Sequence, residues 1–260
     1  MYVFPNAAPQ AAARLRALAA VFDPGTIRHL EARGVGQGWS CLEVGGGLGT
    51  MTRWLSDSVG QRGHVLTTDI DTSLLDSMQP PNVEVRRHDI VADPLPEAAF
   101  DLAYTRLVLE HLSEPDRALA RMVGAVKPGG WVVIEDFEIL PASPDPQDES
   151  TERISKTAAV MRAVTAMAGV RARFGRSLLR RLRAAGLERI GIEGRAFIWP
   201  GGSAGATLNR LNYEQLRDAI LATGRITEEE FAIDLARLDD CDFEIRSPIL
   251  WTAWGQRPSQ

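Results

Sequence analysis

Three acidic side chains and a cluster of glycines stand where this 260-residue chain could bind a ligand. Glu43 comes just before the glycines of CLEVGGGLGT, residues 41–50. Asp69 ends a later apolar segment, 24 residues beyond Gly45, and Asp89 ends another. An acidic residue at that distance from a glycine turn can accept hydrogen bonds from both hydroxyls of a ribose. The pattern therefore indicates a nucleoside-containing ligand, with Asp89 suited to the amino group of an adenine.

The turn contains four glycines in the spacing GxGxG, with glycine also at the first x: Gly45, Gly46, Gly47 and Gly49. It departs from the GxGxxG fingerprint of dinucleotide-binding turns, because Thr50 and Thr52 follow. The carboxylate of Glu43 beside the turn would repel a phosphate and attract an ammonium or sulfonium group. The turn therefore favours a positively charged ligand over the pyrophosphate of NAD. Ile70 and Ile90, one residue beyond each aspartate, are placed to sandwich an adenine ring.

Short apolar runs alternate with amphipathic segments from residue 41 onward, which predicts strands separated by helices. That order implies a parallel sheet with helices on both faces, so the predicted fold class is α/β, Rossmann-like and doubly wound. The predicted strands are 41–44, 64–70, 83–89, 100–105, 131–137, 187–194 and 248–258. The predicted helices are 10–22, one that begins near 26, 49–59, 73–78, 114–126, 174–185, 211–223 and 227–240. An apolar stripe at helical spacing over 160–168 predicts a further helix.

Composition and length limit the class of protein. The chain is 45% apolar and 24% charged, as in an ordinary globular domain, and its net charge of −5 argues against a general nucleic-acid binder. The two cysteines have no CxxC spacing, and no carboxylate or histidine cluster suggests a metal site. No apolar run approaches the roughly 18 residues of a membrane span, and Arg14 and Arg16 interrupt any signal peptide. We therefore expect a cytoplasmic protein with no metal and no membrane partner.

Five motifs occur in a fixed order: LEVGGGLG, TTDID, RRHDI, FDLAYTRLVLEHL and VKPGGWVVIED. Together they resemble the class I S-adenosylmethionine-dependent methyltransferases, of the kind related to ubiquinone and menaquinone methyltransferases. The likeness is greatest to small-molecule methyltransferases of actinomycete type. It covers about residues 10–140 and the terminal strand. The family commonly has Gly-Ala-Gly or Gly-Cys-Gly where this chain has three glycines, which is a minor departure.

The resemblance implies a seven-stranded sheet and a role for each motif residue. The Gly45–Gly49 turn would lie against the methionine part and ribose of S-adenosylmethionine, with Glu43 near the ammonium group. Asp69 would hold the ribose, and Asp89 and Ile90 the adenine. The main chain expected at the methionine end is that of Thr105 and Arg106. S-adenosylhomocysteine would be the product.

We expect one methyltransferase domain over residues 1–260, divided as follows: a helical lid at 1–30, a cofactor-binding core at 31–140, helical cap insertions at 141–172 and 200–240, and terminal strands at 241–260. The large side chains that could line a substrate pocket, or equally pack in a core, are Met161, Met167, Trp199 and Tyr213. His111, in LEHL, is a candidate general base because imidazole titrates near neutral pH, although it could instead orient the loop.

The function expected is methyl transfer to a small molecule, natural-product or quinone-like, by in-line displacement. The residue types do not distinguish methyl transfer to oxygen from methyl transfer to carbon. The chain could be a monomer or a homodimer. One alternative is a scaffold that keeps the fold and the cofactor without transferring a methyl group. A second, an NAD-dependent oxidoreductase, is disfavoured by the glycine spacing and by Glu43.

Overall fold

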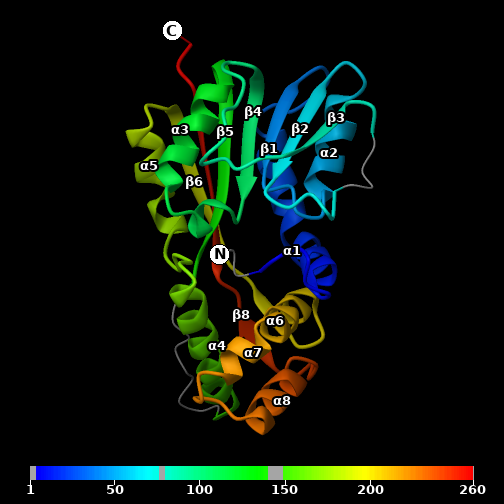
Figure 1. Cartoon of the computed structure of the whole chain (residues 1–260), viewed down its shortest axis with the longest axis vertical. Coiled ribbons are helices and arrows are strands. Elements are labelled where there is room, and N and C mark those ends of the chain that lie inside the picture. Colours follow the sequence, from blue (N-terminus) through cyan, green and yellow to red (C-terminus); the bar gives the residue numbers. More distant parts are fainter. Residues whose placement is uncertain (1–3, 76–79, 140–148, 260) are drawn as a thin grey trace. The chain divides into compact units, whose positions relative to one another are not determined.

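The computed structural model describes residues 4–75, 80–139 and 149–259, which belong to two compact units. The first, here called the sheet unit, comprises residues 22–138, 173–195 and 250–260. The second, here called the helical unit, comprises residues 1–21, 139–172 and 196–249. Helix α1 (Ala11–Glu31) begins in the helical unit and ends in the sheet unit. Figure 1 labels the elements of both units.

The sheet unit is built on seven strands in the order β3-β2-β1-β4-β5-β9-β6. Pairing is parallel between β1 and β2, β1 and β4, β2 and β3, and β4 and β5, and antiparallel between β6 and β9. The order reverses between β1 and β4, where open sheets of this kind bind ligands beyond the strands' carboxyl ends. The bounds are β1 Ser40–Val44, β2 His64–Asp69, β3 Val83–Arg87, β4 Phe100–Arg106, β5 Val126–Glu138, β6 Glu188–Arg195 and β9 Ile249–Gln256. The predicted α/β fold with a seven-stranded sheet is confirmed.

Helices cover both faces of this sheet (Figure 1). Helix α2 (Thr50–Val59) and the end of α1 bury apolar side chains against one face, including Leu30 and Leu55, which share a cluster with Val65 of β2. Helices α3 (Pro115–Ala125) and α5 (Leu178–Ala184) do the same on the other. Two short 3₁₀ turns complete the unit, η1 (Leu109–His111) after β4 and η2 (Gly175–Ser177) before α5. Because both faces are covered, the strands are buried apolar runs, as the sequence pattern indicated.

Helix α1 differs from the prediction of two helices separated near residue 23. It is continuous over Ala11–Glu31, with Pro24 inside it. Proline removes one main-chain donor and usually ends or kinks a helix. Here Thr26, just beyond it, donates a hydrogen bond to Glu135 on β5 at 2.5 Å and another to the Phe22 carbonyl at 3.1 Å. These contacts hold the chain in helical conformation past the proline.

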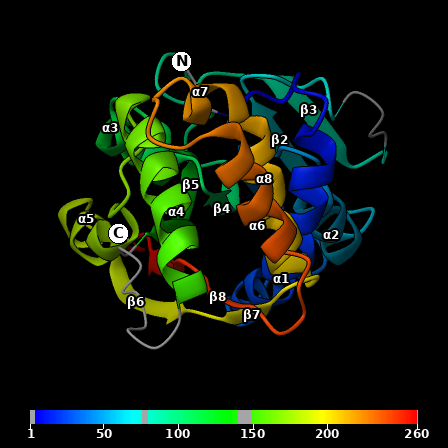
Figure 2. The same ribbon diagram turned by 90° about the horizontal axis from the view of Figure 1, so that it is seen from below.

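The helical unit contains α4 (Glu149–Met167), α6 (Ala204–Gln215), α7 (Arg217–Leu221) and α8 (Glu228–Arg237), with the antiparallel pair β7 (Ile198–Pro200) and β8 (Glu244–Arg246). Helix α4 contacts both α7 and α8, and the helices are seen from below in Figure 2. The carboxylate of Asp234 on α8 accepts a hydrogen bond from the Thr157 hydroxyl on α4. At the surface of the same helix pair, Lys156 forms an ion pair with Glu230 at 3.0 Å.

Three local predictions differ from the structure. Residues 73–75, the described part of the helix expected at 73–78, form a turn, and residues 76–78 lie outside the described residues. Helix α6 begins at Ala204 rather than 211, because the Ser203 hydroxyl caps it by accepting the Ala206 amide at 3.3 Å. The short strands β7 and β8 were not predicted, since three-residue strands carry little periodic signal.

Candidate functional site

The glycine-rich turn lies at the carboxyl end of β1, between β2 and the segment that follows β4. The Gly45 and Gly46 amides both donate to the Thr68 carbonyl, at 2.7 and 3.1 Å. Gly45 has a φ of +80°, and a Cβ there would lie 2.3 Å from Cγ2 of Val108. Only glycine satisfies both the left-handed backbone and this close approach. The turn therefore presents bare backbone where the chain reverses toward α2, whose N-cap is Gly49.

Asp69 ends β2 beside that turn. Its Oδ2 accepts the Gly47 amide at 3.0 Å, and its Oδ1 accepts the Asp71 amide at 3.1 Å. Partial burial raises the pKa of Asp69 above its usual value, while these amide hydrogen bonds act in the opposite direction. Each carboxylate oxygen has two lone pairs, so both oxygens retain capacity to accept a donor from a ligand. Asp69 thus connects the glycine turn to the end of β2.

Glu43 lies beneath the turn and is only 3% exposed. Its Oε2 accepts hydrogen bonds from the Thr52 hydroxyl at 2.5 Å and the Thr67 hydroxyl at 3.2 Å. Burial raises the pKa of Glu43 to about 7, and the two threonine hydrogen bonds oppose that rise. The carboxyl therefore acts on the turn through its charge and its hydrogen bonds to α2 and β2 rather than by reaching into solvent.

Thr105 and Arg106 end β4 beside β1. The Thr105 hydroxyl donates to the Val44 carbonyl at 2.8 Å. The Arg106 guanidinium forms an ion pair with Asp23 at 2.7 Å and donates to the Thr26 hydroxyl at 3.0 Å. Burial alone would lower the pKa of Arg106, but nearby acidic groups raise it, so the guanidinium stays charged. Both side chains are committed to α1 and β1, which leaves only their main chain for a ligand.

The three residues expected around adenine have different environments. Asp89 is exposed, and its Oδ1 accepts the Val91 amide at 2.8 Å, so its carboxylate shapes its own turn. Ile90 is 4% exposed and packs in the core, whereas Ile70 is 53% exposed. Of the two isoleucines, only Ile70 offers a free apolar face.

His111 lies on η1 with its side chain 12% exposed, and its Nε2 is 3.5 Å from Oε1 of Glu110. Glu110 in turn lies beside Asp136 on β5, and both carboxyls are buried. Sequence reasoning did not select either carboxyl. The available signal was an acidic residue inside an apolar context, in LVLEHL and VVIEDF.

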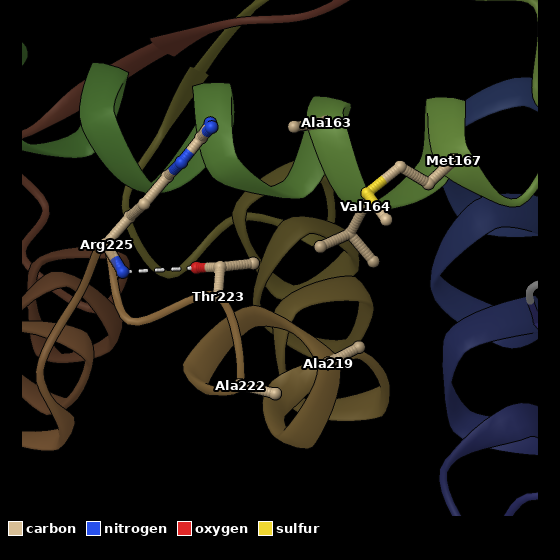
Figure 3. Close-up of a pocket in the computed structure, with 7 residues that line it drawn as sticks. All are labelled: Ala163, Val164, Met167, Ala219, Ala222, Thr223 and Arg225. Carbon is tan, nitrogen blue, oxygen red and sulfur yellow. Dashed lines mark hydrogen bonds between the residues drawn. The ribbon is translucent and has the colours of Figure 1, made fainter.

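The four candidates for the substrate pocket lie in the helical unit. Met167 is 88% exposed and lines a pocket of about 390 Å³ (Figure 3). Met161 is half-buried on the same helix, while Trp199 and Tyr213 are 6% and 3% exposed. Trp199 packs tightly on Gly205, where a Cβ would lie 2.1 Å from the indole. The pocket lies between α4 and the α7 segment and is lined by Ala163, Val164, Met167, Ala219, Ala222, Thr223 and Arg225.

Two further features concern metals and membranes. Within the described residues, one group of potential metal ligands lies close together, formed by the exposed side chains of Asp240, Cys241 and Asp242. In residues 4–75, 80–139 and 149–259, no helix combines the length and hydropathy needed to cross a bilayer. The glycine turn and its neighbouring carboxylates therefore remain the best-defined site in the sheet unit.

Comparison with known proteins agrees with this geometry. The family model described as "Methyltransferase domain" matches residues 42–134. The ubiquinone/menaquinone biosynthesis C-methyltransferase of Vibrio vulnificus (strain YJ016) is 30% identical over 116 residues, which are 42% of this chain and 45% of that protein. The chain thus matches less than half the length of such curated relatives.

Solved structures share the fold at low identity. The (4+2)-cyclase SpnF has a TM-score of 0.55 and 20% identity, over 92% of this chain and 81% of that chain. Phosphoethanolamine N-methyltransferase 2 of Haemonchus contortus, solved with S-adenosylhomocysteine, has a TM-score of 0.55 and 15% identity, over 86% of this chain and 50% of that chain. Identities of this size show the fold alone.

The strand order, the glycine turn and the matched region together define the class I, Rossmann-like methyltransferase fold. Within the chain, residues 42–134 match the family model of the methyltransferase domain.

Proposed function

We propose that this protein is an S-adenosylmethionine-dependent methyltransferase that acts on a small-molecule acceptor, natural-product or quinone-like. The single observation that carries the proposal is the arrangement around Asp69, whose carboxylate fastens the bare GxGxG turn and keeps free lone pairs for a ribose. Similarity to a C-methyltransferase of quinone biosynthesis supports the acceptor class, although it extends over 116 residues only. Cys41 and Cys241 are both free thiols, which supports a cytoplasmic location.

The residues of the site fit this cofactor. The turn residues Gly45, Gly46 and Gly47 are partly exposed and carry no side chain, Asp69 can accept from hydroxyls, and an ionised Glu43 would favour a cationic ligand over a phosphate. Asp89 would act at the adenine end together with the exposed face of Ile70. In this proposal the main chain of Thr105 borders the methionine end.

The bound cofactor supplies a methyl group already activated by a positively charged sulfur. The task of the protein is therefore to hold donor and acceptor in line and to exclude water, which can account for roughly 7–11 kcal/mol of the barrier. Met161, Met167, Trp199 and Tyr213 are the residues to test for an acceptor pocket. His111 is the candidate general base.

A scaffold that binds the cofactor without methyl transfer is the second candidate. Structural similarity to SpnF supports this second candidate, because SpnF is described as a cyclase. Incubation with methyl-labelled S-adenosylmethionine and a panel of phenolic and quinol compounds distinguishes the two functions. Label transfer supports the methyltransferase, whereas cofactor binding without any transfer supports the scaffold.

The proposal predicts that Asp69→Ala weakens S-adenosylmethionine binding by about 1–3 kcal/mol, since hydrogen bonds to a charged acceptor are lost. Isothermal calorimetry would measure this, with NAD as the competing ligand and the exposed Asp57→Ala as the matched control. Unchanged affinity in Asp69→Ala contradicts the ribose role, and tighter binding of NAD than of S-adenosylmethionine contradicts the proposed function.

A further inference from the structure

A second group of titratable side chains lies at the carboxyl edge of β4 and β5, outside the glycine turn. It consists of Glu110 and His111 on η1 and Asp136 on β5. Oε1 of Glu110 is 3.5 Å from Nε2 of His111. Asp136 accepts main-chain hydrogen bonds from Val108 and Glu110, the latter at 3.5 Å, and Oε2 of Glu110 accepts the Phe137 amide at 3.1 Å. Two carboxyls and an imidazole thus form one connected cluster.

The two carboxyls are buried together without a basic partner of their own. Glu110 is 3% exposed and Asp136 is fully buried. In the described part of the chain, neither forms an ion pair with a lysine or arginine, and Oδ2 of Asp136 has no hydrogen-bond partner. Two carboxyls whose charges repel each other in a buried site do not both ionise readily, so the pair retains a proton into the neutral range. Burial raises the pKa of Glu110 to about 8, and burial together with Glu110 raises that of Asp136 well above its usual value.

Among the residues that the structure describes, the other charged groups near the pair have partners elsewhere. Glu135, the preceding residue on β5, raises the pKa of Asp136 further, and its own partners include Arg195, Thr252 and Thr26. On η2, which packs against β5, Arg176 lies 3.6 Å from Glu138 instead. Glu114 and Asp116, at the start of α3, are exposed and pair with Arg117 and with Arg181 of α5. Among the described residues, the His111 imidazole is therefore the group that can supply a positive charge beside the two carboxyls.

The cluster adjoins the glycine turn through Val108. Gly45 packs against this valine, and the His111 amide donates to the Val108 carbonyl at 3.0 Å. His111 is also the most exposed member of the cluster, at 12% against 4% for the Glu110 side chain. A proton can therefore enter or leave the cluster through the imidazole, next to the turn expected to hold the cofactor.

We propose that Glu110 and Asp136 share one proton and one negative charge, that they position His111 and stabilise its protonated form, and that the methyl acceptor is a compound that must lose a proton during transfer. This inference rests on the proposed function. It restricts the acceptor to hydroxyl, N–H or enolisable carbon compounds and excludes tertiary amines and thioethers.

The proton balance is complete without another reagent. An electron pair of the acceptor forms the new bond to the methyl carbon, and the carbon–sulfur bond breaks to leave a neutral thioether. The proton that the acceptor loses passes to His111, whose positive charge then faces the negative charge of the carboxyl pair. The imidazolium afterwards releases this proton to solvent.

A purely structural role for the pair is the competing explanation. Asp136 accepts the first amides of η1, and Glu110 accepts an amide of β5, so together they fasten this turn to the sheet. A fastening role played by two neutral carboxyls would not couple the carboxyl charge to the protonation of the imidazole. The test must therefore read protonation as well as stability.

The experiment follows the histidine ring and carboxyl signals of the full-length protein by NMR as a function of pH, with His111→Gln used to assign the ring. In Glu110→Gln the midpoint of the His111 titration should fall by about one pH unit, a tenfold loss of proton affinity, because the carboxylate 3.5 Å from the ring is removed and the charge then left on Asp136 forms no ion pair with the imidazole in the described residues. In Asp136→Asn the Glu110 carboxyl should titrate at lower pH, since its like-charged neighbour is gone. Glu114→Gln, which removes an exposed carboxylate three residues from His111, should change neither titration.

An unchanged His111 titration in folded Glu110→Gln overturns the inference and leaves the fastening role. If Glu110→Gln does not fold, Glu110→Asp keeps the carboxyl but withdraws it by one methylene, and the His111 midpoint should still fall. S-adenosylmethionine affinity, measured on the same samples, separates the two proposals. If S-adenosylmethionine binds normally but the carboxyl and imidazole titrations are not coupled, only the inference about the carboxyl pair is contradicted. If the wild type does not bind S-adenosylmethionine, the proposed function is contradicted. Label transfer to a tertiary amine or a thioether alone would overturn the restriction on the acceptor.

Discussion

At the scale of single residues, Glu43 illustrates how burial changes what a carboxyl contributes. The sequence places it before the glycine turn, where its charge suits a cationic ligand. The structure shows that its carboxyl lies under the turn and is held by Thr52 and Thr67. Burial raises its pKa from 4.5 to about 7. Its ionisation therefore costs folding free energy at the pH where its charge would help to bind the ligand.

This shift predicts a stability that falls as pH rises. A group whose pKa is higher in the folded state binds its proton more tightly there, so its favourable contribution is complete below about pH 4.5 and is lost as pH rises through about 7. The loss is on the order of 3 kcal/mol for a shift of this size. Urea unfolding at acid and mildly alkaline pH should show a smaller pH dependence in Glu43→Gln than in the wild type. The exposed Glu97→Gln is the control, and an equal pH dependence in the wild type and Glu43→Gln would refute the assignment.

At the scale of elements, helix α1 is determined by what it packs against rather than by its own sequence. Pro24 and Gly25 are poor residues for a helix interior. A Cβ on Gly25 would lie 1.3 Å from Nη1 of Arg195, which shows how closely this guanidinium approaches the helix. Arg195 is bound there by the buried Glu135 at 2.6 Å. The glycine thus makes room for a buried ion pair between β6 and β5.

Gly25→Ala should consequently destabilise the protein, although alanine normally favours a helix by about 0.5–1 kcal/mol over glycine. The added methyl group displaces Arg195 from Glu135, and disruption of a buried pair costs about 3–5 kcal/mol, so we expect a net loss of about 2 kcal/mol or more. Chemical denaturation would measure it. Gly124→Ala in α3 is the matched control, because a Cβ there contacts nothing within 4 Å and should stabilise. Stabilisation by both substitutions would contradict this role of the glycine.

At the scale of the whole molecule, the chain forms two compact units, each with its own internal contacts. In the helical unit, α8 begins with a capping box in which the Thr227 hydroxyl accepts the Glu230 amide and the Glu230 carboxylate accepts the Thr227 amide. The sheet unit is held instead by strand pairing and by apolar clusters on both faces. Local opening of one unit is therefore expected to leave the hydrogen bonds of the other intact.

Thr227→Ala should lower the stability of α8 by about 1 kcal/mol, because the cap is lost. Hydrogen exchange followed by mass spectrometry should then be faster over residues 228–237 and in α4, which packs on α8, and unchanged over β1 and β4. Thr227→Ser keeps the hydroxyl and serves as the control. Faster exchange throughout the sheet would mean that the two units open together.

The sequence by itself determined the features that depend on local interactions. The glycine spacing, the strand before it and the helix after it follow from positive φ angles and short-range hydrogen bonds within residues 41–59, and the alternation of elements predicted the sheet. Asp69 was also within reach of sequence reasoning, since the length of one strand–helix unit sets its distance from Gly45. Its actual contact, the Gly47 amide, agrees with that placement.

The tertiary structure decided what depends on strands and helices distant in the sequence. Glu110 and Asp136 are 26 residues apart and meet because β4 and β5 pair in parallel. Arg106 lies 83 residues from Asp23, so its engagement by α1 has no signal in the local pattern. Ile90 is buried and Ile70 is exposed, although the sequence pattern predicted the same role for both. Side-chain environment is set by long-range packing, and a pattern of neighbours along the chain does not contain it.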